Sequence, residues 1–227
     1  MIERRNLLRA SALTLLAAFV ATTGAIGTAC AADAAVGPYE LVTKVAETTL
    51  KDLDAHRSEY QKDPNKIRQL VDKNMLPYFD TAYAAQLVLG KNWRTANEDQ
   101  RKRFIEGFYQ SMLQNYGDAL LEFTPDRLKI LPFQGKAEDA TATVRSQIRR
   151  DNGSQASVNY TLRKLPDGSW KAYDVTIEGV SYIKSFRTDF GSEIEQKGLD
   201  AVIKRLESQV ASGQVGKPAA PAAKPAA

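Results

Sequence analysis

The hydrophobic period of this chain changes from a helical repeat to strict alternation, and this change constrains the fold class most. Before residue 125 the apolar side chains recur every three to four residues, as on one face of an α-helix. Between residues 128 and 179 they alternate with polar side chains, as in half-buried strands, and after residue 181 the helical spacing returns. Helices, then strands, then helices again predict an α+β fold with an antiparallel sheet.

Four segments carry the alternating pattern: 128–133, 140–149, 156–164 and 170–179. Residues 151–154 (Asp-Asn-Gly-Ser) and 166–168 (Pro-Asp-Gly) are typical hairpin turns between them. One face of the second and third segments is apolar and the other is polar, so we expect a four-stranded twisted antiparallel sheet, covered on one face and wet on the other. In the last segment, strict alternation places Tyr173, Val175 and Ile177 on one face and Trp170, Ala172 and Asp174 on the opposite face.

About six helices are expected to wrap one face of this sheet. Their boundaries follow from apolar spacing and from capping residues such as Asp63, Asp80, Gly90 and Gly198. A capping box over 95–98 (Thr-Ala-Asn-Glu) predicts the start of the longest helix, which Pro125 closes. The predicted helices are 37–57, 64–76, 80–89, one from the capping box at 95–98 to about 123, 181–196 and 199–210.

The two ends of the chain differ in composition from the middle. Arg4, Arg5 and Arg9 precede an uncharged apolar run over 10–21, and Ala-Cys-Ala at 29–31 resembles a cleavage site, so residues 1–32 are interpreted as a secretory signal peptide. Residues 33–211 form the folded domain, and the Ala/Pro/Lys-rich residues 212–227 are expected to be disordered. The alternative is a lipoprotein acylated at Cys30, although Gly27 stands where a lipobox usually has Leu.

The sequence offers little that is typical of catalysis or of nucleic-acid binding. The formal net charge is +4, but Lys and Arg are interleaved with Asp and Glu, and no basic stripe indicates nucleic acid. His56 is the only histidine, and neither a nucleophile elbow, a phosphate loop nor a metal-binding motif is present. We therefore expect no enzymatic activity and no cofactor. The alternative is an enzyme that uses acidic residues such as Glu106 or Asp174.

Several segments together resemble one family, the periplasmic phospholipid-binding proteins of the Mla lipid-transport pathway (the MlaC, or toluene-tolerance, family). The resemblance extends over roughly residues 37 to 210, and each segment is weak when taken alone. The segments are Leu-Gly-Lys-Asn-Trp-Arg-Thr-Ala at 89–96, Val-Asn-Tyr-Thr-Leu-Arg at 158–163, Trp-Lys-Ala-Tyr-Asp-Val at 170–175, Ile-Glu-Gly-Val-Ser at 177–181, Phe-Arg-Thr-Asp-Phe at 186–190 and Gly-Leu-Asp-Ala-Val-Ile at 198–203.

This resemblance implies a role as well as a fold. It implies a hydrophobic pocket between the helices and the concave face of the sheet, which holds phospholipid acyl chains with the headgroup near solvent. It also implies a periplasmic shuttle between an outer-membrane lipoprotein–porin complex and an inner-membrane ABC transporter that carries an MCE-domain protein. Such a shuttle maintains the lipid asymmetry of the outer membrane. The resemblance carries over no catalytic residue and no cofactor.

The candidate pocket residues are chosen by the face on which they lie. Apolar stripes of this kind are also typical of an ordinary filled core, and periodicity does not separate the two. Lys184 and Arg187 are candidates for a phosphate contact, with a solvated surface as the alternative. The expected lipid-binding residues are Phe104, Phe108, Met112, Tyr116, Val144, Ile148, Val158, Tyr160, Tyr173, Val175, Ile177, Val180, Ile183 and Phe186.

Overall fold

The computed structural model describes residues 36–116, 120–121, 124, 126–136, 138–150 and 152–212. The predicted signal peptide and residues 213–227 of the predicted disordered tail lie outside these ranges, so both stay predictions, whereas residue 212, the first of the predicted tail, is helical. The described elements are α1 (Pro38–Lys62), α2 (Pro64–Asn74), the 3₁₀ turn η1 (Leu76–Tyr78), α3 (Thr81–Leu89), α4 (Lys91–Thr95), α5 (Glu98–Tyr116), β1 (Leu128–Ile130), β2 (Thr141–Arg149), β3 (Gln155–Lys164), β4 (Trp170–Ile177), β5 (Val180–Ser181), α6 (Tyr182–Lys197) and α7 (Leu199–Ser212).

The strands form one antiparallel meander in the order β1-β2-β3-β4-β5. The α+β class and the antiparallel sheet are therefore confirmed, but the prediction of four strands is wrong. The additional strand β5 has two residues and pairs with the end of β4 through the turn at Glu178 and Gly179. Two residues are too few for the alternating pattern to be recognised in the sequence.

A β-bulge in β4 corrects the predicted facing of its side chains. Leu162 is opposite Ala172, but Thr161 is opposite Asp174, so Tyr173 is the extra residue in the ladder. An extra residue shifts the two-residue alternation by one position. Trp170 and Ala172 therefore share a face with Val175 and Ile177, whereas Tyr173 packs edge-on against Tyr83 of α3.

Seven α-helices lie within the described residues, against about six expected. The additional one is α4, a short helix between Gly90 and the start of α5. The capping box of α5 lies two residues later than predicted. Asn97 and Gln100 exchange backbone-to-side-chain hydrogen bonds of 2.8 and 3.0 Å, whereas Thr95 bonds back to the carbonyl of Asn92. The α5 helix is described as far as Tyr116, and the predicted end at residue 123 lies outside the described residues.

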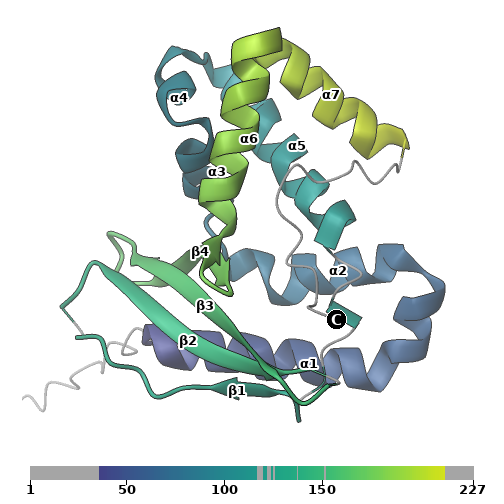
Figure 1. Ribbon diagram of the computed structural model, residues 1–227, viewed down its shortest axis with the longest axis vertical. Coiled ribbons are helices and arrows are strands. Elements are labelled where there is room, and N and C mark those ends of the chain that lie inside the picture. The colour runs from purple at the N-terminus through teal and green to yellow at the C-terminus, as the bar shows by residue number, and fades with distance from the viewer. Residues whose placement is uncertain are drawn as a thin grey trace, which may run out of the picture. The chain divides into compact units, whose positions relative to one another are not determined.

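The helices form two groups around the sheet. Figure 1 shows α3 to α7 gathered above the sheet and α1 running along β2. The upper group has its own core, which includes Phe104 and Phe108 of α5, Phe190 of α6 and Leu206 of α7. Two other cores join α1 to the sheet and α1 to α2. The space where these three cores approach one another contains the candidate site.

Candidate functional site

An apolar cavity of about 390 Å³ lies between the inner face of the sheet and the helices. Its wall is made by α1, α2 and η1, by α5 and α6, and by the inner-facing residues of β1 to β4. The lining residues are Leu41, Val42, Val45, Ala46, Thr49, Leu50, Leu53, Val71, Met75, Leu76, Tyr78, Phe79, Tyr109, Met112, Leu113, Leu120, Leu128, Ile148, Val158, Tyr160, Leu162, Ala172, Asp174, Val175, Ile177, Tyr182, Ile183 and Phe186.

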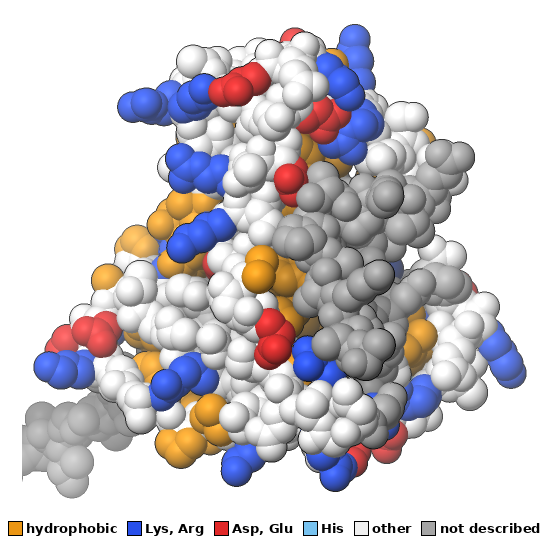
Figure 2. Space-filling model, viewed as in Figure 1, with side chains coloured by type: hydrophobic (Ala, Val, Ile, Leu, Met, Phe, Trp, Pro, Cys, Tyr) orange, Lys and Arg blue, Asp and Glu red, His pale blue; other side chains and the backbone are white. Residues whose placement is uncertain are grey.

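Figure 2 shows hydrophobic side chains at the surface near the centre of the face in view, between the upper helices and the sheet, with acidic and basic side chains below them.

Eight of the fourteen predicted site residues line the cavity, because the sheet and the helices bring them to one space. The sheet contributes them from one face, where Val158 is opposite Ile177 and Tyr160 is opposite Val175. The eight are Met112, Ile148, Val158, Tyr160, Val175, Ile177, Ile183 and Phe186. Their role in lipid binding stays a prediction that the geometry supports.

Phe104, Phe108 and Val144 lie away from the cavity, in filled cores. The rings of Phe104 and Phe108 are stacked with centroids 5.8 Å apart, and both meet Phe190 edge-on. Val144 is fully buried in the core between α1 and the sheet. Phe104, Phe108 and Met112 follow one another at four-residue intervals on one face of α5. Along this face the surroundings change, from the core of the upper helices at Phe104 to the cavity at Met112.

Three further candidates are not on the wall either. Tyr173 is the bulged residue that packs against Tyr83, and Val180 on β5 is 41% exposed. The side chain of Tyr116 lies outside the described part of the chain.

The wall made by α1 was not among the predicted site residues. Leu41, Val45, Thr49 and Leu53 follow one another at four-residue intervals, and all of them line the cavity. The spacing itself is visible in the sequence and was used to predict this helix. Nothing in the sequence shows that this stripe faces an open space instead of a filled core.

Asp174 is the one carboxylate on the described wall, and its oxygens are occupied. It is only 9% exposed, and it accepts hydrogen bonds from the hydroxyl of Ser181 at 2.5 Å and from the backbone amide of Ile183 at 3.1 Å. Ser181 in turn caps α6 by accepting from the amide of Lys184. The carboxylate therefore fixes the start of α6 against β4.

Tyrosines provide other polar groups on the wall. Burial raises the pKa of the Tyr160 phenol, which lies beside Ser146. Burial also raises the pKa of Tyr109, and its hydroxyl donates to the carboxylate of Asp72 on α2. Both phenols stay neutral at any physiological pH.

Glu106 and His56, two of the residues considered for catalysis, form side-chain hydrogen bonds within their own helices. Glu106 lies on the exposed side of α5 and accepts a hydrogen bond from Gln110, one turn along the same helix. His56 is exposed on α1 and bonds to Asp52. In the described ranges, no group of three or more His, Cys, Asp and Glu side chains could hold a metal ion, and no helix there is long and apolar enough to cross a membrane.

The fold and the cavity define a class of small α+β proteins that can enclose an apolar ligand, and comparison with known proteins places the chain within it. The family model described as MlaC protein matches residues 43–208. The chain belongs to this family.

Two curated relatives and one solved structure agree with this assignment. The chain is 27% identical over 195 residues to the Haemophilus influenzae "Intermembrane phospholipid transport system binding protein MlaC", covering 85% of this chain and 88% of the relative. It is 30% identical over 213 residues to the Pseudomonas putida "Toluene tolerance protein ttg2D", covering 92% and 94%. A phospholipid-binding protein from Ralstonia solanacearum, solved in complex with a phospholipid, matches with a TM-score of 0.69 and 25% identity, covering 76% of this chain and 96% of that one.

Proposed function

We propose that this chain is a periplasmic phospholipid-binding shuttle of the Mla pathway. The observation that carries the proposal is the apolar cavity of about 390 Å³ in a chain of this family. A cavity of this size falls within the roughly 300–1,000 Å³ of ordinary small-molecule pockets. The relatives named for intermembrane phospholipid transport and for phospholipid binding support the same ligand class.

The physical demand on such a shuttle agrees with the composition of the wall. Every acyl methylene exposed to water costs about 0.8 kcal/mol, so a carrier has to enclose most of the two chains. The wall presents aliphatic and aromatic side chains from α1, α2, η1, α5, α6 and the sheet, and its buried polar side chains are few. A wall of this kind binds acyl chains by excluding water and does not need a precise set of donors.

Location and partners belong to the same proposal. The predicted signal peptide over residues 1–32 supports export, and the family supports the periplasm. The proposed partners are an outer-membrane lipoprotein–porin complex and an inner-membrane ABC transporter with an MCE-domain protein. Moving glycerophospholipid between them would maintain the lipid asymmetry of the outer membrane.

The proposed shuttle is not an enzyme. The hydrogen bonds that Asp174 accepts from Ser181 and Ile183 support a structural role for this carboxylate of the cavity wall. Phospholipase, esterase and glycosidase assays test the alternative: turnover that disappears in Glu106→Gln or Asp174→Asn would establish an enzyme instead.

The direct test is to purify the exported protein from cells and to analyse an organic extract by mass spectrometry. We expect roughly stoichiometric glycerophospholipid. A protein that carries no lipid and takes none up from phospholipid vesicles would contradict the proposal. The intact mass of the same sample also tests the alternative of an anchored adaptor, because a mature chain that begins with acylated Cys30 could not diffuse between membranes.

A further inference from the structure

A charged residue, Arg150, directly follows the inner face of β2 (Thr141–Arg149). Ala142, Val144, Ser146 and Ile148 alternate along this face, and continuing the alternation places Arg150 on the same side. Exposure agrees with this placement: the side chain of Arg150 is 23% exposed, whereas that of Arg149, on the opposite face, is 58% exposed. An arginine therefore lies at the end of an otherwise apolar and hydroxyl-bearing column.

This end of the sheet borders the cavity. Ile148 lines the cavity, as do Leu128, Val158 and Ile177 on the neighbouring strands at the same end. Arg150 is two residues beyond Ile148, about 7 Å further along the strand. An arginine side chain can reach over that distance, so its guanidinium is placed where the apolar wall ends and solvent begins.

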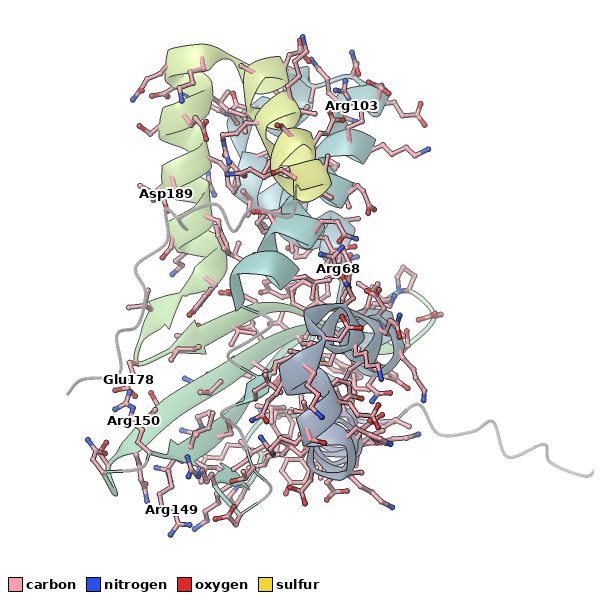
Figure 3. All side chains as sticks on the ribbon, turned by 90° about the vertical axis from the view of Figure 1, so that its right-hand side faces the viewer. Arg68, Arg103, Arg149, Arg150, Glu178 and Asp189 are labelled. Atoms are coloured by element: carbon pink, nitrogen blue, oxygen red, sulfur yellow. The ribbon has the colours of Figure 1, made fainter. Side chains whose placement is uncertain are left out.

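The guanidinium of Arg150 extends sideways across the sheet end. It forms an ion pair of 3.7 Å with Glu178, which belongs to the turn after β4, so the Arg150 side chain spans the intervening strand β3. The β3 residue on the inner face at this point is Ala156, whose small side chain leaves room for the crossing. Figure 3 shows Arg150 and Glu178 together at the sheet end, with Arg149 apart from them.

Glu178 is held in place more tightly than a solvated glutamate. Its backbone has φ +50°, a conformation that residues other than glycine seldom adopt. Its carboxylate accepts a 2.6 Å hydrogen bond from the backbone amide of Ser157. The ion pair with Arg150 is longer than an N–H···O hydrogen bond of about 2.7–3.2 Å. The ion pair with Glu178 therefore orients the Arg150 guanidinium towards the sheet end, but at 3.7 Å it is not a close hydrogen bond to the guanidinium N–H groups.

We propose that Arg150 binds the phosphate group of the lipid whose acyl chains occupy the cavity. This inference rests on the proposed function. A planar guanidinium forms paired hydrogen bonds to phosphate oxygens, and these charge-assisted bonds are stronger than neutral ones. Glu178 keeps the guanidinium at the sheet end when no lipid is bound, and the phosphate replaces this distant partner by a close one. The contact recognises the phosphate that all glycerophospholipids share and not the alcohol attached to it.

The geometry favours Arg150 over the two cations that the sequence indicated. The guanidinium of Arg187 lies against Gly90, at the junction of α3 and α4, because a Cβ placed on Gly90 would meet it at 3.1 Å. Lys184 is exposed in the first turn of α6. Neither side chain continues an apolar column of the cavity wall as Arg150 does.

The test compares two lipids that differ only by the phosphate. Lipid-stripped protein is incubated with vesicles that contain equal amounts of dioleoyl phosphatidic acid and dioleoylglycerol, and the bound lipid is quantified by mass spectrometry. We expect wild type to prefer the phospholipid by tenfold or more, and Arg150→Gln to lower this preference to about threefold or less. Arg149→Gln is the matched control, since it removes the same charge from the neighbouring residue on the opposite face, and it should keep the wild-type preference.

The outcomes separate this inference from the function on which it rests. If neither lipid enters the wild-type protein, the proposed shuttle function fails. If both enter and Arg150→Gln keeps the wild-type preference, the shuttle stands and the phosphate contact is overturned. Should Arg150→Gln not fold, Arg150→Lys keeps the charge without the paired donors, and a preference as high as in wild type would equally overturn the proposal.

A free phosphate ion offers the same chemistry as a lipid phosphate, so a final arm distinguishes them. The anchored lipid phosphate is expected to resist 10 mM inorganic phosphate, added as a competitor during loading. Isothermal titration of the lipid-stripped protein with inorganic phosphate should show no tight binding. Micromolar binding of inorganic phosphate that disappears in Arg150→Gln would assign the site to the free ion and overturn the lipid contact.

Discussion

Replacing a small wall residue by tryptophan distinguishes the cavity from the filled core. Val158 and Val144 are both buried valines on the inner face of the sheet, on neighbouring strands, but only Val158 lines the cavity. In Val158→Trp the indole has an empty space to enter. In Val144→Trp the same ring has to displace packed side chains of α1 and the sheet. The two substitutions add the same atoms in different surroundings.

The expected effects follow from these surroundings. Overpacking a filled core costs about 1–3 kcal/mol or more, so Val144→Trp should lower the Tm of the lipid-free protein by roughly 3–10 °C. Val158→Trp should stay within about 3 °C of wild type. An indole that excludes about three acyl methylenes from the cavity removes about 2.4 kcal/mol of binding free energy, a roughly fiftyfold loss of lipid affinity.

Thermal unfolding of the lipid-free proteins and lipid uptake from vesicles measure both effects. The reasoning would be refuted if Val158→Trp were unfolded, because the wall would then be an ordinary core. It would also be refuted if Val158→Trp folded and bound as much lipid as wild type, since acyl chains would not occupy the space beside β3. Val144→Phe, a smaller overpacking at the control position, should fold with a smaller loss of Tm.

Three other expectations concern the surroundings of the cavity. Asp174→Ala removes the acceptor of Ser181 and Ile183 at the start of α6, so urea unfolding should show a loss of about 1–2 kcal/mol, and unchanged stability would argue against this anchoring role. The hydrogen bond to the carboxylate of Asp52 raises the pKa of His56 in the folded protein. The His56–Asp52 pair therefore stabilises the fold fully below the pKa of about 6.5 that histidine has in the unfolded chain, and this contribution disappears as the pH rises through the folded-state pKa. Denaturation midpoints across pH 5–8 should therefore depend on pH less in His56→Gln than in wild type, and equal dependence would contradict the assignment. Phosphatidylethanolamine and phosphatidylglycerol should bind with affinities within about tenfold of each other, and a hundredfold preference in a competition assay that Arg187→Ala abolishes would show a specific headgroup site instead.

Much of the fold could be predicted because its signals are local. The hairpin turns at Gly153 and Gly168 both have positive φ, as their turn sequences require, and Asp63 and Asp80 cap α2 and α3 through their side chains. These features depend on residues within four positions of each other, and so do the helical and alternating periods. The errors in the fold arose where a signal was short, as in the two-residue strand β5, or ambiguous, as between Thr95 and Asn97 for the cap of α5.

The cavity could be predicted only in part because its shape depends on distant contacts. Phe108 and Met112 are one turn apart on the same stripe of α5, yet Phe108 packs against Phe186 and Phe190 and Met112 faces the cavity. What separates them is the position of α6, which a local pattern on α5 does not encode. The wall residues of α1 were missed for the same reason, although their spacing was recognised.

The bulge in β4 bears on how the length of this chain can vary. Tyr173 is an extra residue in the ladder, and the residues before and after it keep their partners on β3 without using it. A deletion of Tyr173 alone would restore regular alternation and leave Val175 and Ile177 facing the cavity, with the loss of the ring contact to Tyr83. A deletion of Thr176, three residues later, would turn Ile177 to the other face. Within this strand, a change of one residue in length is therefore tolerable at the bulge and disruptive elsewhere.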